Sequence, residues 1–131
     1  MINKIYNKRM MKILAAKDSF KFGVVELLLL AMLKNEDKYG YQISQETLDL
    51  SDGHLCLKEG SMYPVLYKLM EKGYITSRIE KIGQRRTRVY YHLEESGKVY
   101  LAETKNNYIT NIKAICKIAE ISKEELFSTQ L

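Results

Sequence analysis

Hydrophobic residues along this chain repeat with helical spacing in most segments and with strand spacing near the middle. The stretch FGVVELLLLAML, from Phe22 to Leu33, is apolar almost all round. Such a pattern is typical of a helix that is buried on most faces or shared with a partner subunit. After the polar break at 35–40, Ile43, Thr47 and Leu50 recur four and three residues apart. We therefore predict a central core helix followed by a shorter second helix that ends before Ser51.

The segment EGSMYPVLYKLMEKGY, residues 59–74, predicts a third helix of about three turns. Its apolar residues Met62, Leu66 and Leu69 share one face, and Gly73 is the residue type that commonly ends a helix. The chain's one proline, Pro64, is then expected in the first turn, where backbone amides have no helical acceptor.

The period changes to that of a strand in RVYYHL, where Val89, Tyr91 and Leu93 alternate with more polar residues. Residues 74–82 also suit a strand, and Gly83 and Gln84 can form the turn between the two. This part of the chain therefore predicts a β-hairpin.

From Glu94 onward the spacing is helical again. The repeating apolar residues form a narrow stripe that favours packing against a partner helix: Leu101, Tyr108, Ile112, Ile115 and Ala119. SKEE at residues 122–125 matches a capping box and predicts a new helix start at Ser122.

Charge is concentrated in the predicted hairpin. The whole chain has a net charge of +5, and residues 78–88 hold five cations and one anion, a balance of 5 − 1 = +4. Such a basic tip suits DNA phosphates or a narrow minor groove. The alternative is a solvated turn with no partner.

The predicted third helix has a second, polar face. Ser61, Tyr63 and Tyr67 lie at or near its leading end, with Lys68 beside them. Helices that read the major groove present hydrogen-bonding side chains there. The alternative is that the tyrosines are amphipathic core residues. Three helices followed by a basic hairpin and a long helix is the order of a winged helix-turn-helix, so we predict a mainly α protein with a small β-hairpin.

The same residues carry a family resemblance. Gly60-Ser61-Met62-Tyr63-Pro64 is followed by Leu66, Leu69, Glu71 and Gly73, and then by Gly83, Arg85, Tyr90, Tyr91, Leu93 and Gly97. With Tyr39-Gly40-Tyr41 upstream, this series resembles the PadR family of bacterial transcriptional regulators over about residues 22–100. The chain departs from the family pattern at Met62, in the GQRRTR wing, and at Glu94 and Glu95, where a threonine commonly caps the last helix.

The resemblance implies a homodimeric repressor of the short subtype, with N-terminal and C-terminal dimerisation helices and a roughly palindromic operator. The cysteine usage leads us to expect a cytoplasmic protein. We divide the chain into an N-terminal basic amphipathic helix or arm (1–20), a DNA-binding domain (21–94) and a C-terminal dimerisation helix (95–131). The dimer interface is expected on the apolar stripe. The predicted DNA contacts are Tyr41, Gln42, Lys58, Ser61, Met62, Tyr63, Tyr67, Lys68, Arg85, Arg86 and Arg88.

Family members commonly respond to small molecules, some of them aromatic or drug-like, and in the short subtype the ligand can sit at the dimer interface. Tyr108 and Asn111 lie on the stripe helix, and Met11 and Phe22 could approach from the partner's first helix. Aromatic and methionine side chains form adaptable apolar pockets. A plain dimer core is the alternative for each of these residues.

The sequence gives little support for other functional classes. The two cysteines, Cys56 and Cys116, form no CxxC pair and are expected to be free thiols; the longest apolar run is too short to span a bilayer. His54 and Cys56 could form a metal site or a catalytic pair, but further ligands of this kind are too few. We therefore expect no enzyme, metal or cofactor. A winged-helix regulator of the MarR or ArsR kind and an interaction module that does not bind DNA remain as alternatives.

Overall fold

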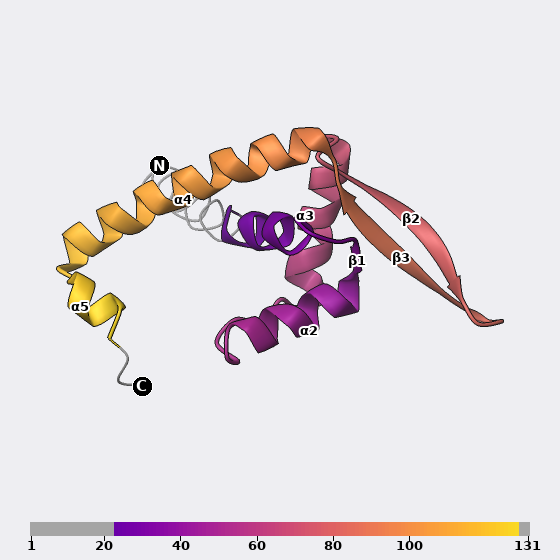
Figure 1. Cartoon of the computed structure of the whole chain (residues 1–131), viewed down its shortest axis with the longest axis horizontal. Helices are drawn as coiled ribbons and strands as arrows, with labels where there is room; N and C mark the ends of the chain where they lie inside the picture. Colours follow the sequence, from indigo (N-terminus) through magenta and orange to yellow (C-terminus); the bar gives the residue numbers. More distant parts are fainter. Residues whose placement is uncertain (1–22, 129–131) are drawn as a thin grey trace, which may run out of the picture.

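A computed structural model describes residues 23–128 of the chain. The first helix is described over residues 23–32 and is followed by strand β1 (Lys38–Tyr39). The remaining elements, in chain order, are α2 (Gly40–Leu50), α3 (Glu59–Glu71), β2 (Ile75–Ile82), β3 (Arg86–Leu93), α4 (Glu95–Ala119) and α5 (Lys123–Leu126). This is the predicted winged helix-turn-helix order. The hairpin projects from one end of the molecule and the second half of α4 from the other (Figure 1).

The β-strands form a three-stranded antiparallel sheet in the order β1-β3-β2. In the predicted hairpin Ile75 pairs with Leu93 and Ile82 with Arg86. Gly83 adopts a φ of 74° in the turn between them, a left-handed conformation that glycine takes without strain. Strand β1 was missed by the sequence analysis, because a two-residue strand is too short to show a period.

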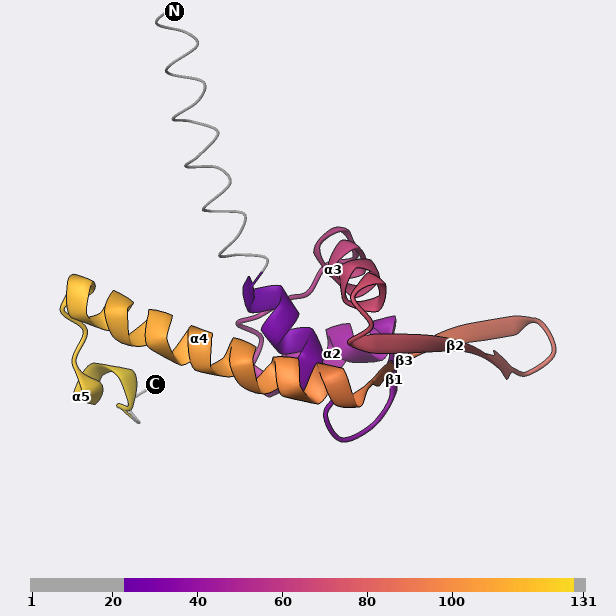
Figure 2. The same ribbon diagram turned by 90° about the horizontal axis from the view of Figure 1, so that it is seen from above.

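One hydrophobic core joins the first helix, α2, α3, the sheet and the start of α4. Its most deeply buried side chains are Leu29, Leu30, Ile43, Met62, Leu66, Leu69 and Ile75. The predicted packing face of the third helix is therefore confirmed. Because α3 lies across the first helix and α2, its opposite face is left toward solvent (Figure 2).

The position of Pro64 corrects one expectation. Helix α3 begins at Glu59, with Lys58 as its N-cap, so Pro64 lies inside the helix. Its nitrogen has no proton to donate to the Gly60 carbonyl, which an ordinary residue at this position would bond. Helix α3 ends at Glu71, and Gly73, the predicted terminating residue, follows the C-cap Lys72 with a φ of 76°.

Helix α4 follows strand β3 directly; its first turns pack in the core, and its second half extends beyond it (Figure 1). Its N-cap is Glu94, whose side chain accepts a hydrogen bond from Thr76 Oγ1 at 2.8 Å and does not cap the helix. The predicted capping box at Ser122 and Glu125 is present at the start of α5. In residues 23–128, no helix is both long enough and apolar enough to cross a membrane.

Candidate nucleic-acid interface

The start of α2, the outer face of α3 and strand β3 meet at a pocket of about 310 Å³. Tyrosines from all three elements line it, together with Arg88. The complete lining is Tyr39, Gly40, Tyr41, Tyr63, Tyr67, Thr87, Arg88, Val89 and Tyr91. We call this the tyrosine pocket. It brings together four predicted DNA contacts, Tyr41, Tyr63, Tyr67 and Arg88, from segments far apart in the sequence.

Close packing of α3 against the start of α2 positions Tyr63. A Cβ atom built on Gly40 would lie 2.6 Å from Tyr63 Oη and 3.2 Å from Tyr63 Cζ. Only a glycine lets the phenol approach the α2 backbone this closely. Tyr63 is therefore half-buried against the core, and its hydroxyl lies at the N-terminal end of α2.

The base of the wing is fastened by ring contacts. The Arg88 guanidinium carbon lies 4.1 Å from the centroid of the Tyr39 ring, and Tyr39 makes an edge contact with Tyr90 at 5.5 Å. The Arg78 guanidinium carbon lies over the Tyr90 ring, 5.2 Å from its centroid. Cation–π contacts of this kind hold a guanidinium in place while leaving its charge available.

Ion pairs change the charge balance predicted for the wing. Arg78 pairs with Asp37 and, at 2.9 Å, with Glu80, so its charge is neutralised within the protein. Burial alone would raise the pKa of Asp37, but hydrogen bonds and charge from His92 and Arg78 outweigh it and lower that pKa overall. Among residues 23–128, no ion pair involves Lys81, Arg85 or Arg86, and these exposed cations remain for an anionic partner.

A second ion pair holds β1 to α2. The Lys38 side chain is 10% exposed and pairs with Glu36 at 2.8 Å and Glu46 at 2.7 Å. Burial disfavours its charge, yet the two carboxylates outweigh that effect and raise the pKa of Lys38 overall. The same Glu46 accepts a hydrogen bond from Gln42, so that predicted DNA contact already has a protein partner.

The other predicted contacts lie in different environments. Tyr41 and Tyr67 are 67% and 61% exposed, and Lys58 and Lys68 are exposed as well. Ser61 is half-buried. Met62 is only 1% exposed, so the prediction of Met62 as a DNA contact is wrong: its side chain belongs to the core. Tyr39 and Tyr91 line the pocket although neither was predicted as a DNA contact: Tyr39 is the N-cap of α2, and the pairing of β3 with β1 places Tyr91 beside it.

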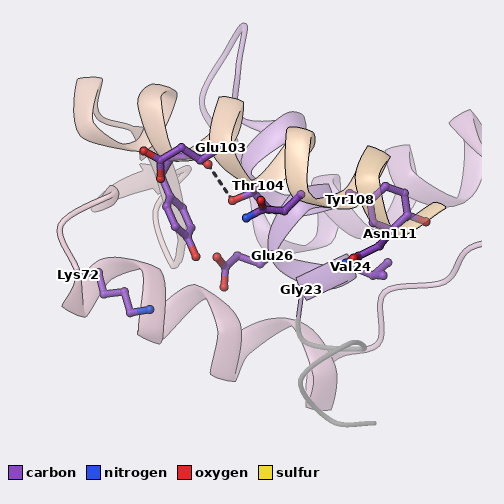
Figure 3. A pocket seen from close by; sticks show the side chains of 10 residues that line it. Gly23, Val24, Glu26, Lys72, Glu103, Thr104, Tyr108 and Asn111 are labelled. Atoms are coloured by element: carbon purple, nitrogen blue, oxygen red, sulfur yellow. Dashed lines mark hydrogen bonds between the residues drawn. The ribbon is translucent and has the colours of Figure 1, made fainter. Parts of the chain in front are cut away.

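A second pocket, of about 250 Å³, lies between the first helix and α4 (Figure 3). Tyr108 and Asn111, two predicted effector contacts, line it with Val24 and Glu26. Burial, followed by the nearby Glu26, raises the pKa of Tyr100 in the same pocket to about 12. The other two predicted effector contacts, Met11 and Phe22, lie outside the described residues.

The residues of the predicted dimer stripe separate into two groups. Leu101 is 9% exposed and packs in the hydrophobic core of its own chain, so its prediction as an interface residue is corrected. Further along α4, Ile112 and Tyr108 are half-buried, whereas Ile115 is 42% exposed and Ala119 is exposed. The second half of the stripe is therefore the part that could meet another chain.

His54 and Cys56 are both exposed in the loop between α2 and α3. Within residues 23–128, no group of three or more His, Cys, Asp and Glu side chains is arranged to hold a metal ion.

Two relatives of known sequence match about two thirds of the chain. A relative from Lysinibacillus sphaericus, described as "Uncharacterized protein X", is 31% identical over 81 residues, which are 62% of this chain and 74% of that protein. Transcriptional regulator YqjI of Escherichia coli K12 is 30% identical over 86 residues, 66% of this chain. The chain spans only 40% of the length of YqjI.

Solved structures show the same fold. A transcriptional regulator from Clostridium thermocellum superposes with a TM-score of 0.68 and 28% identity, over 72% of this chain and 92% of that one. Bacillus subtilis PadR, in its complex with operator DNA, gives a TM-score of 0.57 and 29% identity, over 61% of this chain and 46% of that one. The family model described as "Transcriptional regulator PadR-like family" matches residues 29–103, more than half of the chain. This protein therefore belongs to the PadR-like family of transcriptional regulators.

Proposed function

We propose that this chain binds duplex DNA in a sequence-specific manner, with α3 in the major groove and the β2–β3 wing on the adjacent backbone or minor groove. Two observations carry the proposal. Two exposed tyrosines, Tyr41 and Tyr67, line the tyrosine pocket, and the cations at the wing tip are exposed and form no ion pair among residues 23–128. Ring hydroxyls offer hydrogen bonds, and the cations offer sequence-independent attraction to phosphates. The structure of B. subtilis PadR with operator DNA supports this assignment.

Direct readout is assigned to the outer face of α3. Ser61 and Tyr67 lie on this helix away from the buried Met62 and Leu66, and Lys68 is exposed next to Tyr67. Backbone contacts are assigned to the wing, because Lys81, Arg85 and Arg86 are exposed there. The interface is thus divided between a helix that reads bases and a hairpin that holds the backbone.

The proposal includes a homodimer that acts as a repressor. The second half of α4 extends beyond the core and exposes apolar side chains: Ile109 at 40%, Ile115 at 42% and Ile118 at 84%. In a two-fold dimer the two copies of α3 would read half-sites about one DNA turn, roughly 34 Å, apart. A small aromatic effector in the pocket of Tyr108 and Asn111, beside that half of α4, would release the repressor.

Binding to genomic DNA fragments at several salt concentrations tests the proposal. With about four phosphate contacts per subunit, a dimer should show log affinity falling with log salt at a slope of roughly −7. A protein of the winged-helix interaction type would show no such dependence. Absence of salt-dependent binding would overturn the proposed function.

A further inference from the structure

We propose that the tyrosine pocket binds one phosphate group of the DNA backbone, held by the amides at the start of α2 and the hydroxyls of Tyr63 and Tyr91. This inference rests on the proposed function, and it assigns a contact to Tyr91 that the strand pattern alone would place in the core.

The first part of the site is the N-terminal end of α2. This helix has 11 residues, its N-cap Tyr39 makes no side-chain cap, and its first turn has no acidic residue. The amides of Gly40, Tyr41 and Gln42 therefore lack both helical acceptors and a capping oxygen. Orphan amides at such an end, aided by the helix dipole, favour an anion.

The second part of the site is the side chain of Tyr91, which gives evidence for a ligand that does not depend on the helix end. Tyr91 is only 4% exposed, yet it lines the pocket. Within residues 23–128, its hydroxyl makes no hydrogen bond. The Tyr91 hydroxyl is not among the enclosed polar atoms that lack a partner, so it is open to the pocket and can donate to a ligand bound there.

Two neighbouring hydroxyls lie around Tyr91. Tyr63 Oη lies against Gly40, at the amides of α2, and Tyr67 extends from the next turn of α3. Electrostatic coupling to both rings accompanies burial in raising the pKa of Tyr91, as expected when the hydroxyls lie near one another. Phenol hydroxyls that lie close together can all donate to one acceptor with several oxygens.

The ligand class follows from these donors. The amides at the start of α2 and the phenol protons can donate to an acceptor, and the Arg88 guanidinium over Tyr39 adds a positive charge beside the pocket. Among residues 23–128, no acidic side chain lines the pocket. A phosphodiester has two charged oxygens to receive such bonds. The DNA backbone would supply it where the strand passes between α3 and the wing, and the contact would fix how deeply α3 enters the groove.

The test compares Tyr91→Phe with Tyr90→Phe. Both variants remove one hydroxyl from β3 and keep the ring, but Tyr90 lies on the opposite face of the strand, against Tyr39. We expect Tyr91→Phe to weaken binding to genomic DNA fragments at least about tenfold, the usual loss for a hydrogen bond to a charged group. The slope of log affinity against log salt should stay unchanged because no charge is removed. Tyr90→Phe should bind within about twofold of the unmodified protein.

A second measurement does not need DNA. Titration with dimethyl phosphate, and separately with inorganic phosphate, should shift the amide resonances of Tyr41 and Gln42 in the unmodified protein but not in Tyr91→Phe. Tyr63→Phe gives the same comparison if thermal melting shows that Tyr91→Phe is unfolded. Amide shifts without any DNA binding would retain the anion site, as one for free phosphate, and overturn the proposed function.

Two results would overturn the phosphate site itself. One is salt-dependent DNA binding by the unmodified protein with equal affinity in Tyr91→Phe, which leaves the proposed function standing. The other is the absence of amide shifts with both phosphates.

Discussion

The phenol of Tyr63 packs directly on the backbone of Gly40, so α3 and the start of α2 are in contact at a point where a Cβ atom would lie 2.6 Å from Tyr63 Oη. This contact links the position of α3 to the start of α2. Because the tyrosine ring is rigid, Tyr63 Oη can shift only if the whole ring moves, and Met62 Cε lies 3.3 Å from the same Cβ position.

Gly40→Ala is therefore expected to lower the free energy of unfolding by about 1–3 kcal/mol, the usual effect of overpacking. Tyr63→Phe removes the atom that clashes most closely, so the double variant should be less destabilised than the sum of the single variants. Urea unfolding of the unmodified protein, the two single variants and the double variant measures the coupling energy between the two substitutions, expected at roughly 0.5–3 kcal/mol. Additive effects would show that the two helices adjust without contact between these residues.

Gly97→Ala should destabilise the protein by about 3 kcal/mol, at the upper end of overpacking effects. A Cβ there would collide with the backbone carbonyl of Tyr74 and lie 2.6 Å from Leu93 Cδ1, and a backbone atom cannot move aside cheaply. Gly60→Ala is the matched control, because a Cβ at this α3 position meets no neighbouring atom of residues 23–128 within 4 Å. It should raise stability by about 0.5–1 kcal/mol through helix propensity. Equal melting temperatures for the two variants would contradict the packing described for Gly97.

Replacing Arg85 and Arg86 with alanine should weaken binding to all DNA sequences and flatten the salt slope by roughly 3–4 for a dimer, about 0.9 for each cation. Lys113→Ala with Lys117→Ala removes the same charge from the exposed side of α4 and should leave the slope near that of the unmodified protein. Fluorescence anisotropy over a salt series measures the slope for both double variants. An unchanged slope in the arginine variant would remove the wing tip from the interface.

Stability should fall as the pH rises from about 10 to about 12. Burial and the nearby Glu26 raise the pKa of Tyr100 to about 12 from an ordinary 10.0, so the folded protein holds this proton more tightly than the unfolded chain. The stabilising contribution is complete below pH 10 and is lost as the pH approaches 12. Between pH 9 and pH 11, the free energy of unfolding measured with urea should fall less for Tyr100→Phe than for the unmodified protein. Equal declines would show that Tyr100 is not a source of this pH dependence.

Ile112→Asp with Ile115→Asp should give monomers that bind DNA poorly, because the exposed half of the α4 stripe would then carry two charges. Val99→Asp is the control: Val99 is 63% exposed on α4 but lies away from the stripe. Sedimentation velocity reports the mass of each protein. A dimer that persists in the double variant would refute the proposed interface.

Local sequence patterns accounted for most of the secondary structure. The four-and-three spacing of Ile43, Thr47 and Leu50 predicted α2, and the alternation in β3 with its glycine turn predicted the hairpin. These predictions succeeded because period, turn chemistry and capping act between residues close together in the chain. The position of Pro64 in α3 was predicted less accurately. The helix begins at Glu59, with Lys58 as its N-cap, five residues before Pro64. One missing amide hydrogen bond does not end a helix whose other face is buried.

The sequence by itself determined the family, the order of the elements and the concentration of cations in the wing. Tertiary structure alone decided which side chains remain available. Arg78 is neutralised by Asp37, 41 residues away in sequence, Met62 and Leu101 are enclosed by the core, and Tyr91 meets the start of α2 through strand pairing. Such contacts join residues distant along the chain, and their energies depend on burial and geometry that no local spacing encodes.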